Sequence, residues 1–229
     1  MPPNWATEGA QVEESKWERW SALGGIAFVI LLLVTFFLPG TPPKTSDDAA
    51  KMVKFITDKH NEIRISTYIG TLAVVFLFWW LGAVWRLMRR AEGGSPRLAV
   101  VALSGGIFAS AMAAVGGILL GVMPIVGANT LGTGGTKTFY ILSTNIGISS
   151  LFGAAVFLAA FSALIIRSGV MPALLGWAGA VIAVVALVGG VGVSSTKDAV
   201  FTVAYVGFLA FLAWVLVVAV MMWRTPSNG

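Results

Sequence analysis

Few side chains in this 229-residue chain could support chemistry: it contains no cysteine and one histidine, His60. The lack of cysteine excludes disulfides, thiolate metal sites and cysteine nucleophiles, and one histidine cannot alone form a bis-histidine haem or a multi-histidine zinc or copper site. Asp58, His60 and Glu62 come nearest to an acid and a base, and would serve an enzyme acting on a lipid head group. No defined spacing pairs them. The sequence therefore predicts a protein that is not an enzyme, with no catalytic residue, metal site or cofactor.

A glycine-rich stretch before Lys137 imitates a phosphate-binding loop. Residues 127–139 read GANTLGTGGTKTF. The phosphate-binding pattern needs a glycine directly before the lysine and a strand before the loop, but Thr136 stands before Lys137 and no strand pattern precedes the stretch. We therefore expect a flexible connector here, and no nucleotide ligand.

The elements that must position these residues are membrane helices. Hydrophobic residues make up 57% of the chain and charged residues 11%, whereas soluble proteins have about 25% charged residues. Crossing a bilayer takes about 20 apolar residues in a helix. The sequence predicts an all-α membrane protein with six spans in one domain over residues 20–223, flanked by polar tails at 1–19 and 224–229. The spans are expected at residues 20–38, 65–85, 98–123, 139–166, 170–193 and 200–223.

None of the six spans contains Asp, Glu, Lys, Arg or His. Proton relays, ion-coupled transport and intramembrane acid–base catalysis rely on ionisable groups at depth. The sequence therefore argues against a pump, a proton-coupled antiporter and an aspartyl or metal-dependent intramembrane protease.

Arginine is concentrated around the link between the second and third spans, where Arg86, Arg89, Arg90 and Arg97 face only Glu92. An excess of basic residues marks cytoplasmic loops, so both termini are expected in the cytoplasm, although residues 39–64 also carry basic side chains. The net charge of +5 is spread over loops instead of forming a stripe, and no nucleic acid partner is expected.

The segment TSDDAAKMVKFITDKH follows the first span and predicts an amphipathic helix over about residues 46–63, capped by Ser46. Met52, Ile56 and His60 fall on its apolar face and form a candidate lid. That face is expected to rest on lipid head groups, on the rim of the bundle or on another protein. His60 is interpreted as a packed histidine, with a pH sensor or a lone ligand as the alternative.

Small residues recur every four positions along the third span, which predicts close helix packing and a central place for this helix. Polar residues gather in the half of the bilayer expected to face outward. They suggest either hydrogen bonds between helices or a polar-lined cavity open to the outside. The packing residues are Gly105, Ala109, Ala113, Gly117 and Gly121, and the cavity candidates are Thr71, Asn145, Ser149 and Ser150.

The stretches DDAAKMVKFITDKHNEIR and FLFWWLGAVWRLMRRAEGG, followed by a Gly/Ala-rich third span, resemble a broad group of uncharacterised actinobacterial integral membrane proteins. The resemblance implies a multi-pass protein of the bacterial cytoplasmic membrane without an assigned activity.

Two functions follow from this inventory. The first is a non-enzymatic accessory or scaffold component of a larger membrane complex or homo-oligomer in the lipid bilayer. The alternative is a binder or passive conduit for a lipid or small neutral molecule, which would use the outward-facing polar cavity.

Overall fold

The structure, a computed structural model, describes residues 4–195 and 198–224 and contains no strand within them. Six of its helices are long and apolar enough to cross a bilayer, which confirms the predicted six-span, all-α architecture. The chain is therefore a multi-pass membrane protein. Its helices are α1 (Asn4–Phe37), α2 (Ala49–Asp58), α3 (His60–Glu92), α4 (Arg97–Val126), α5 (Ala128–Ser168), α6 (Ala173–Gly190), the 3₁₀ turn η1 (Val191–Ser194) and α7 (Asp198–Arg224).

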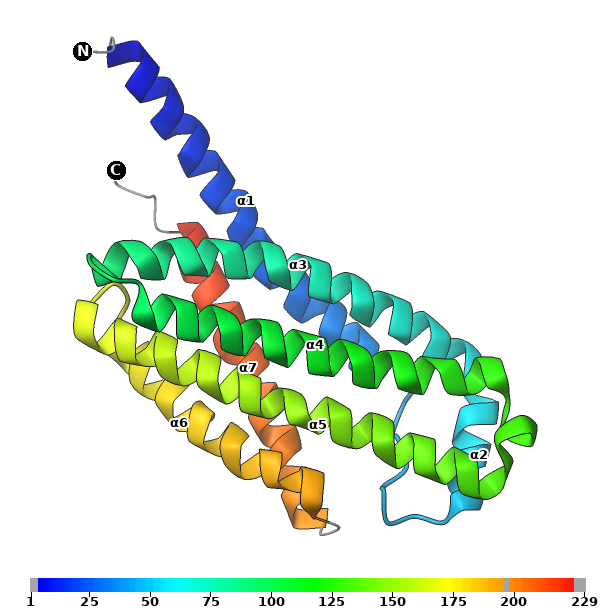
Figure 1. Cartoon of the computed structure of the whole chain (residues 1–229). Coiled ribbons are helices and arrows are strands. Elements are labelled where there is room, and N and C mark those ends of the chain that lie inside the picture. Colours follow the sequence, from blue (N-terminus) through cyan, green and yellow to red (C-terminus); the bar gives the residue numbers. More distant parts are fainter. Residues whose placement is uncertain (1–3, 196–197, 225–229) are drawn as a thin grey trace.

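The six long helices run side by side in alternating directions (Figure 1). The α3–α4 and α5–α6 links lie at one end of the bundle, named the arginine end because it carries Arg89, Arg90 and Arg97. The short helix α2, the α4–α5 link and η1 lie at the other end, named the α2 end. Left-handed glycines, Gly93 and Gly169, stop α3 and α5 at the arginine end.

Helix α5, not α4, occupies the centre of the bundle. In the apolar window of α5, 61% of the residues are buried, against 28% for α4. Helix α5 packs on α2, α4 and α6, whereas one side of α4 exposes Ile107, Phe108 and Ile118. The expectation of a central third span is wrong, because small residues permit close approach on one face of a helix and do not bury its other faces.

The small residues of α4 nevertheless make close contacts with two neighbours. A Cβ added to Gly153 of α5 would lie 2.6 Å from the backbone nitrogen of Ala109 and from the carbonyl oxygen of Gly105. Gly121 lies so close to Thr67 of α3 that a Cβ there would overlap its side chain. Both contacts are of the small-residue kind that brings membrane helices together.

Large aromatic side chains fill the half of the bundle nearer the arginine end. The ring centroids of Trp80 and Phe157 lie 5.8 Å apart, those of Phe157 and Phe161 5.9 Å, and those of Phe161 and Trp214 5.5 Å. All four side chains are buried. Tilted and edge-to-face rings at these distances attract one another beyond simple burial. These four residues, here named the aromatic cluster, join α3, α5 and α7.

A bend at Lys59 divides the helix predicted over residues 46–63. Lys59 has φ −110° and ψ 21°, and α3 begins directly after it at His60. The expected cap at Ser46 is wrong, since Asp48 precedes the first turn of α2 and makes no side-chain cap bond. The bend lets α2 lie across the end of the bundle while α3 turns into the membrane.

Two segments outside the predicted spans are helical. The backbone of residues 4–19 continues α1. The connector predicted at 127–139 is helical from Ala128 onward, apart from a kink at Gly132, which has φ 64° and ψ 173°. Both segments lengthen a helix that already spans the bundle, and each residue added to an existing helix gains one backbone hydrogen bond. The outer ends of the two predicted tails, residues 1–3 and 225–229, lie outside the described residues.

Candidate functional site

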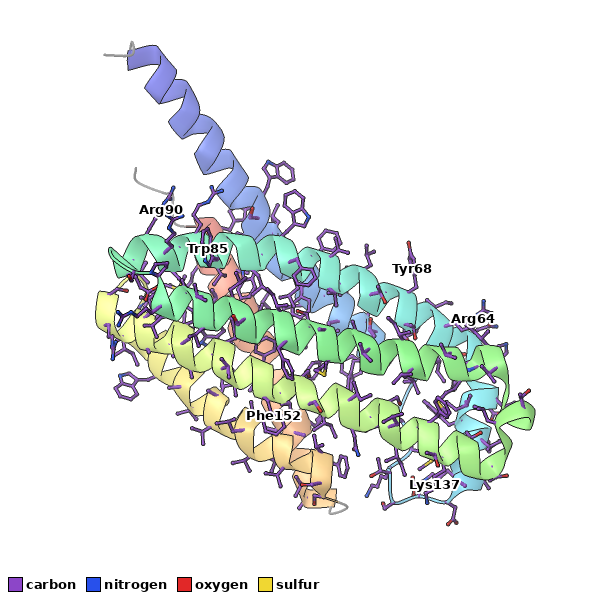
Figure 2. The ribbon with its side chains drawn as sticks, viewed as in Figure 1. Arg64, Tyr68, Trp85, Arg90, Lys137 and Phe152 are labelled. Carbon is purple, nitrogen blue, oxygen red and sulfur yellow. The ribbon has the colours of Figure 1, made fainter. Side chains whose placement is uncertain are left out.

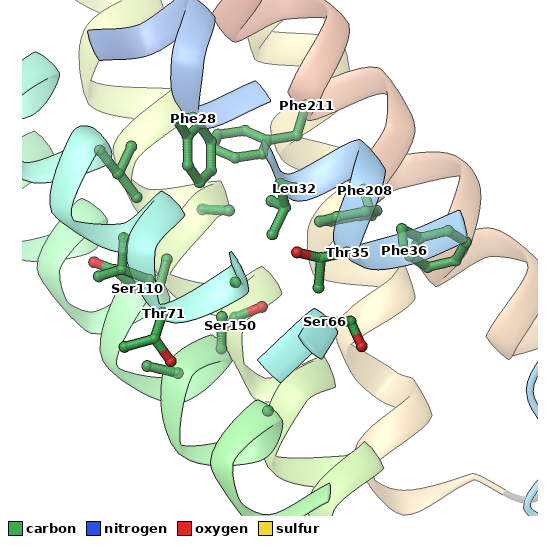
Figure 3. Close-up of a pocket in the computed structure, with 18 of the residues that line it drawn as sticks. Phe28, Leu32, Thr35, Phe36, Ser66, Thr71, Ser110, Ser150, Phe208 and Phe211 are labelled. Atoms are coloured by element: carbon green, nitrogen blue, oxygen red, sulfur yellow. The ribbon is translucent and has the colours of Figure 1, made fainter. Parts of the chain in front are cut away.

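A cavity of about 300 Å³ lies between α1, α3, α4, α5 and α7, in the half of the bundle nearer the α2 end (Figure 3). Towards the middle of the bundle it ends on Trp80 and Phe157 of the aromatic cluster and on Leu81. Towards the α2 end it is bordered by Pro39 of the α1–α2 link and Phe55 of α2. The cavity therefore has an aromatic floor and lies under the α1–α2 link.

The lining is almost wholly apolar in character. Phe28, Phe208 and Phe211 contribute aromatic rings from α1 and α7 (Figure 3). Five of the six hydroxyl side chains in the lining donate to a carbonyl oxygen one turn back in their own helix. Such bonds satisfy a hydroxyl inside a membrane helix and leave no proton for a ligand. The five are Thr35, Ser66, Thr67, Thr71 and Ser110.

Ser150 of α5 is the sixth hydroxyl, and it makes no hydrogen bond within residues 4–195 and 198–224. Its side chain points into the space between α1 and α4 (Figure 3). A hydroxyl without a partner in an apolar environment carries a free-energy penalty that a ligand atom can remove. The buried indole N–H of Trp80 also lacks a partner, but that edge of the ring lies against Gly25 of α1.

The cavity exists because α4 offers small side chains where its neighbours offer no compensating bulk. Ala109, Ala113, Gly117 and Leu120 line it at three- and four-residue spacing, and so share one face of the helix. A Cβ added to Gly117 would meet no atom within 4 Å. Ala113 and Gly117, predicted to pack against another helix, form part of the cavity wall instead.

Only two of the four residues that were predicted at a polar cavity line the observed cavity. Thr71 and Ser150 do line the cavity, whereas Asn145 and Ser149 do not. The Asn145 amide donates to the carbonyl of Val193 at 3.4 Å, and the Ser149 hydroxyl donates to the carbonyl of Asn145 at 2.9 Å. The cavity is thus apolar where the second of the two alternatives predicted a polar lining, because most hydroxyls in membrane helices bond to their own backbone.

Helix α2 is anchored to the bundle by its apolar face. Met52 and Ile56, predicted as parts of a lid, are buried against Ile63, Met123 and Tyr140. They hold α2 in place but do not line the cavity. Phe55 is the α2 residue that does so; its half-buried side chain lies between the two faces of the helix, a position that the periodic pattern assigned to neither.

His60, expected on the buried face of the lid, is exposed at the start of α3, with its Nδ1 3.1 Å from the carbonyl oxygen of Thr57. No group of three or more His, Cys, Asp or Glu side chains that could hold a metal occurs in the described part of the chain. The carboxylates that flank His60 in sequence each pair with a lysine, Asp58 with Lys54 at 2.8 Å and Glu62 with Lys59 at 3.1 Å.

Two contacts from α5 hold the α1–α2 link, and sequence reasoning missed both. The buried Tyr140 hydroxyl donates to the carbonyl of Pro43 at 2.6 Å, and the Lys137 ammonium donates to the carbonyl of Asp47 at 3.1 Å. A signal was present, since Lys137 is a lone charge beside a long apolar run. The Asp47 carboxylate in turn pairs with Lys51 at 2.8 Å, and the hydrogen bond from Lys51 is the main reason its pKa lies below the usual range.

Comparison with protein-family models, with curated proteins and with solved structures finds no match to this chain.

Proposed function

We propose that the protein binds an apolar, lipid-like molecule in the cavity between α1, α3, α4, α5 and α7. The cavity itself carries this proposal, because its volume of about 300 Å³ falls at the lower end of the range of small-molecule sites, roughly 300–1,000 Å³. Aromatic and aliphatic side chains with one unpartnered hydroxyl, Ser150, suit an apolar ligand with at most a few polar atoms. The floor formed by Trp80 and Phe157 favours a binder over a passive conduit.

The energetics of packing support a bound molecule. Side chains that line an unfilled apolar space lose the dispersion contacts that a close-packed interior would give them. A ligand that fills the space recovers a large part of these dispersion contacts without any charged group.

We further propose that the protein lies in a bacterial cytoplasmic membrane with the arginine end inside the cell. Arg89 stacks on Trp85 with 5.3 Å between the guanidinium carbon and the ring centroid, which is the pairing expected at a membrane interface. This orientation places α2, and the half of the bundle that holds the cavity, towards the outside.

A pair of matched substitutions tests the binding proposal. Ala113→Phe places a ring in the cavity, whereas Ala111→Phe adds the same ring to the exposed side of α4 two residues earlier. Native mass spectrometry of protein extracted in mild detergent should find a retained lipid-like mass with the unchanged chain and with Ala111→Phe. Ala113→Phe should lose it. Equal retention by both variants would show that any bound molecule sits outside the cavity.

An accessory role in a membrane assembly is a second candidate, and the N-terminal part of α1 supports it. Residues 4–19 extend α1 beyond the other helices (Figure 1), so this segment is available to another subunit. The separate bonding of His60, Asp58 and Glu62 supports a non-catalytic role. Native electrophoresis should detect a larger complex that disappears when residues 4–19 are deleted. A monomer with or without that segment would argue against this candidate.

A further inference from the structure

The cavity reaches the lipid-facing surface of α3 at Thr71. Thr71 lines the cavity and is also exposed. It stands one helical turn from Tyr68 and Val75, whose side chains are 73% and 50% exposed. Residues three and four apart share one face of a helix. Thr71 therefore lies where the lining of the cavity meets the outer face of α3.

Ala114 occupies the matching position on α4. It lines the cavity and stands one turn from Ala111 and Ile118, which are both exposed. Its side chain is a single methyl group, so α4 presents little bulk at this edge. Thr71 and Ala114 are here named the side opening.

Close helix contacts bound the side opening on both sides. Towards the α2 end, Thr67 packs on Gly121, and towards the arginine end, Leu81 packs on Gly106. The two contacts are 14 residues apart on α3, or about 21 Å along the helix. Between them α4 carries mainly Ala, Gly and Ser on its cavity side. The lateral access is thus confined to the middle of the α3–α4 seam.

A cationic side chain, Arg64, lies between the side opening and the α2 end, on the same face of α3. Arg64 is four residues before Tyr68 and seven before Thr71, or about 11 Å from Thr71 along the helix. Arg64 and Tyr68 project from the same side of α3, away from the bundle (Figure 2). Within the described residues Arg64 has neither an ion pair nor a hydrogen bond. Arginine binds phosphate through two parallel N–H donors, and a guanidinium near the membrane surface reaches lipid head groups.

We propose that one acyl chain of a bilayer phospholipid enters the cavity sideways between α3 and α4, while Arg64 holds the phosphate of the same lipid. The proposal rests on the proposed function, because it names the ligand of that cavity. The cavity follows α3 from Ser66 to Trp80, about 21 Å at 1.5 Å per residue. A volume of about 300 Å³ over this length is narrow, and suits a single chain better than a fused ring system.

The alternative route for an apolar ligand leads from water at the α2 end into the cavity. The structure favours entry from the membrane. The α1–α2 link that borders the cavity there is held by Tyr140 and Lys137. At the side opening Thr71 is exposed, on the face that carries Tyr68 and Val75, which hydrocarbon surrounds in a bilayer. A lipid chain in that hydrocarbon enters without crossing water.

Photolabelling in vesicles tests the route. The full chain is reconstituted in phosphatidylethanolamine and phosphatidylglycerol vesicles, with a phosphatidylglycerol probe that carries a diazirine midway along one acyl chain. A second sample receives a diazirine derivative of octanol, which is small enough to enter from either direction. Mass spectrometry then measures labelling of the α5 segment around Ser150. Both probes should label this segment in the unchanged chain.

Two substitutions close the side opening from opposite helices, Ala114→Trp and Thr71→Trp. Each should lower labelling by the lipid probe about tenfold and lower labelling by the octanol probe much less. Ala111→Trp, on the exposed side of α4, should change neither. Arg64→Gln should lower lipid labelling alone, whereas Arg97→Gln, the same change at the arginine end, should have no effect. The octanol signal also reports whether each variant keeps a folded cavity.

The outcomes separate the two proposals. Lipid labelling that survives both tryptophan substitutions would overturn lateral entry, and so would a chain labelled by octanol but not by lipid. In both cases the cavity would still be a binding site. A chain labelled by neither probe around Ser150 would overturn the proposed function together with this inference.

Discussion

The two halves of the bundle pack in different ways. Near the arginine end, the aromatic cluster fills the space between α3, α5 and α7. Near the α2 end, α4 presents Ala113 and Gly117 to the interior, and hydroxyls such as Thr35 bond to their own helix. Side-chain volume, more than polarity, therefore decides where the cavity lies.

The largest effect is expected in the aromatic cluster. Trp80 is 0% exposed, and Trp80→Ala should cost about 3–5 kcal/mol of stability because it removes the contacts of a buried ring and enlarges the cavity. Trp80→Phe, which keeps a ring and removes the unpartnered N–H, should cost much less. On the cavity side, Phe36→Ala should cost only about 1 kcal/mol, since Phe36 is half-buried. Unfolding in mixed detergent micelles measures all three, and equal losses for Trp80→Ala and Phe36→Ala would contradict the contrast.

Substitutions at two glycines compare how closely the helix backbones pack in the two halves. Gly153→Ala should cost about 1–3 kcal/mol, because its Cβ would lie 2.6 Å from backbone atoms of α4. Gly117→Ala should be neutral or stabilising by about 0.5–1 kcal/mol, since its Cβ meets open space. The melting temperatures of the purified variants check the signs. A destabilising Gly117→Ala would mean that the seam near the cavity is closely packed.

A smaller effect concerns the link over the cavity. Tyr140→Phe keeps the ring and removes the hydroxyl that donates to Pro43, which should cost about 1 kcal/mol. Amide hydrogen exchange should rise across residues 38–48 with little change elsewhere. Tyr68→Phe, at a side chain that is 73% exposed, is the matched control and should leave exchange unchanged. If both variants behave alike, the Tyr140 bond does not hold the link.

The smallest effect is a response to acid. The pKa of Asp47 lies below its ordinary value of 3.8, through hydrogen bonds from Lys51 and from the Lys44 backbone. A lowered pKa stabilises the fold above the unfolded value, near pH 4, and this contribution is lost as pH falls through the folded pKa. Amide hydrogen exchange of residues 44–51 should be slower in the unchanged chain than in Asp47→Asn at pH 6. At pH 2 the two proteins should exchange at equal rates. A ratio that is constant with pH would contradict the role of this carboxylate.

Particular residues mark how far the sequence could predict the site. Thr71 and Ser150 were expected at a cavity and line it, because their polarity stands out in an apolar run. Ala113 carries no such signal, since a small residue gives the same sequence pattern whether it packs against a helix or lines a cavity. Phe55 and Tyr140 were missed because their roles depend on where α2 lies after the bend at Lys59.

Run length and the absence of charge were enough to determine six helical spans, since in hydrocarbon a lone segment satisfies its backbone groups only as a helix. Tertiary structure alone decided that α5 is central, that Ala113 and Gly117 face a cavity, and that α2 covers one end. These outcomes depend on the combined volume of side chains from helices distant in sequence. No local pattern encodes that sum, because each helix carries only its own share of the space to be filled.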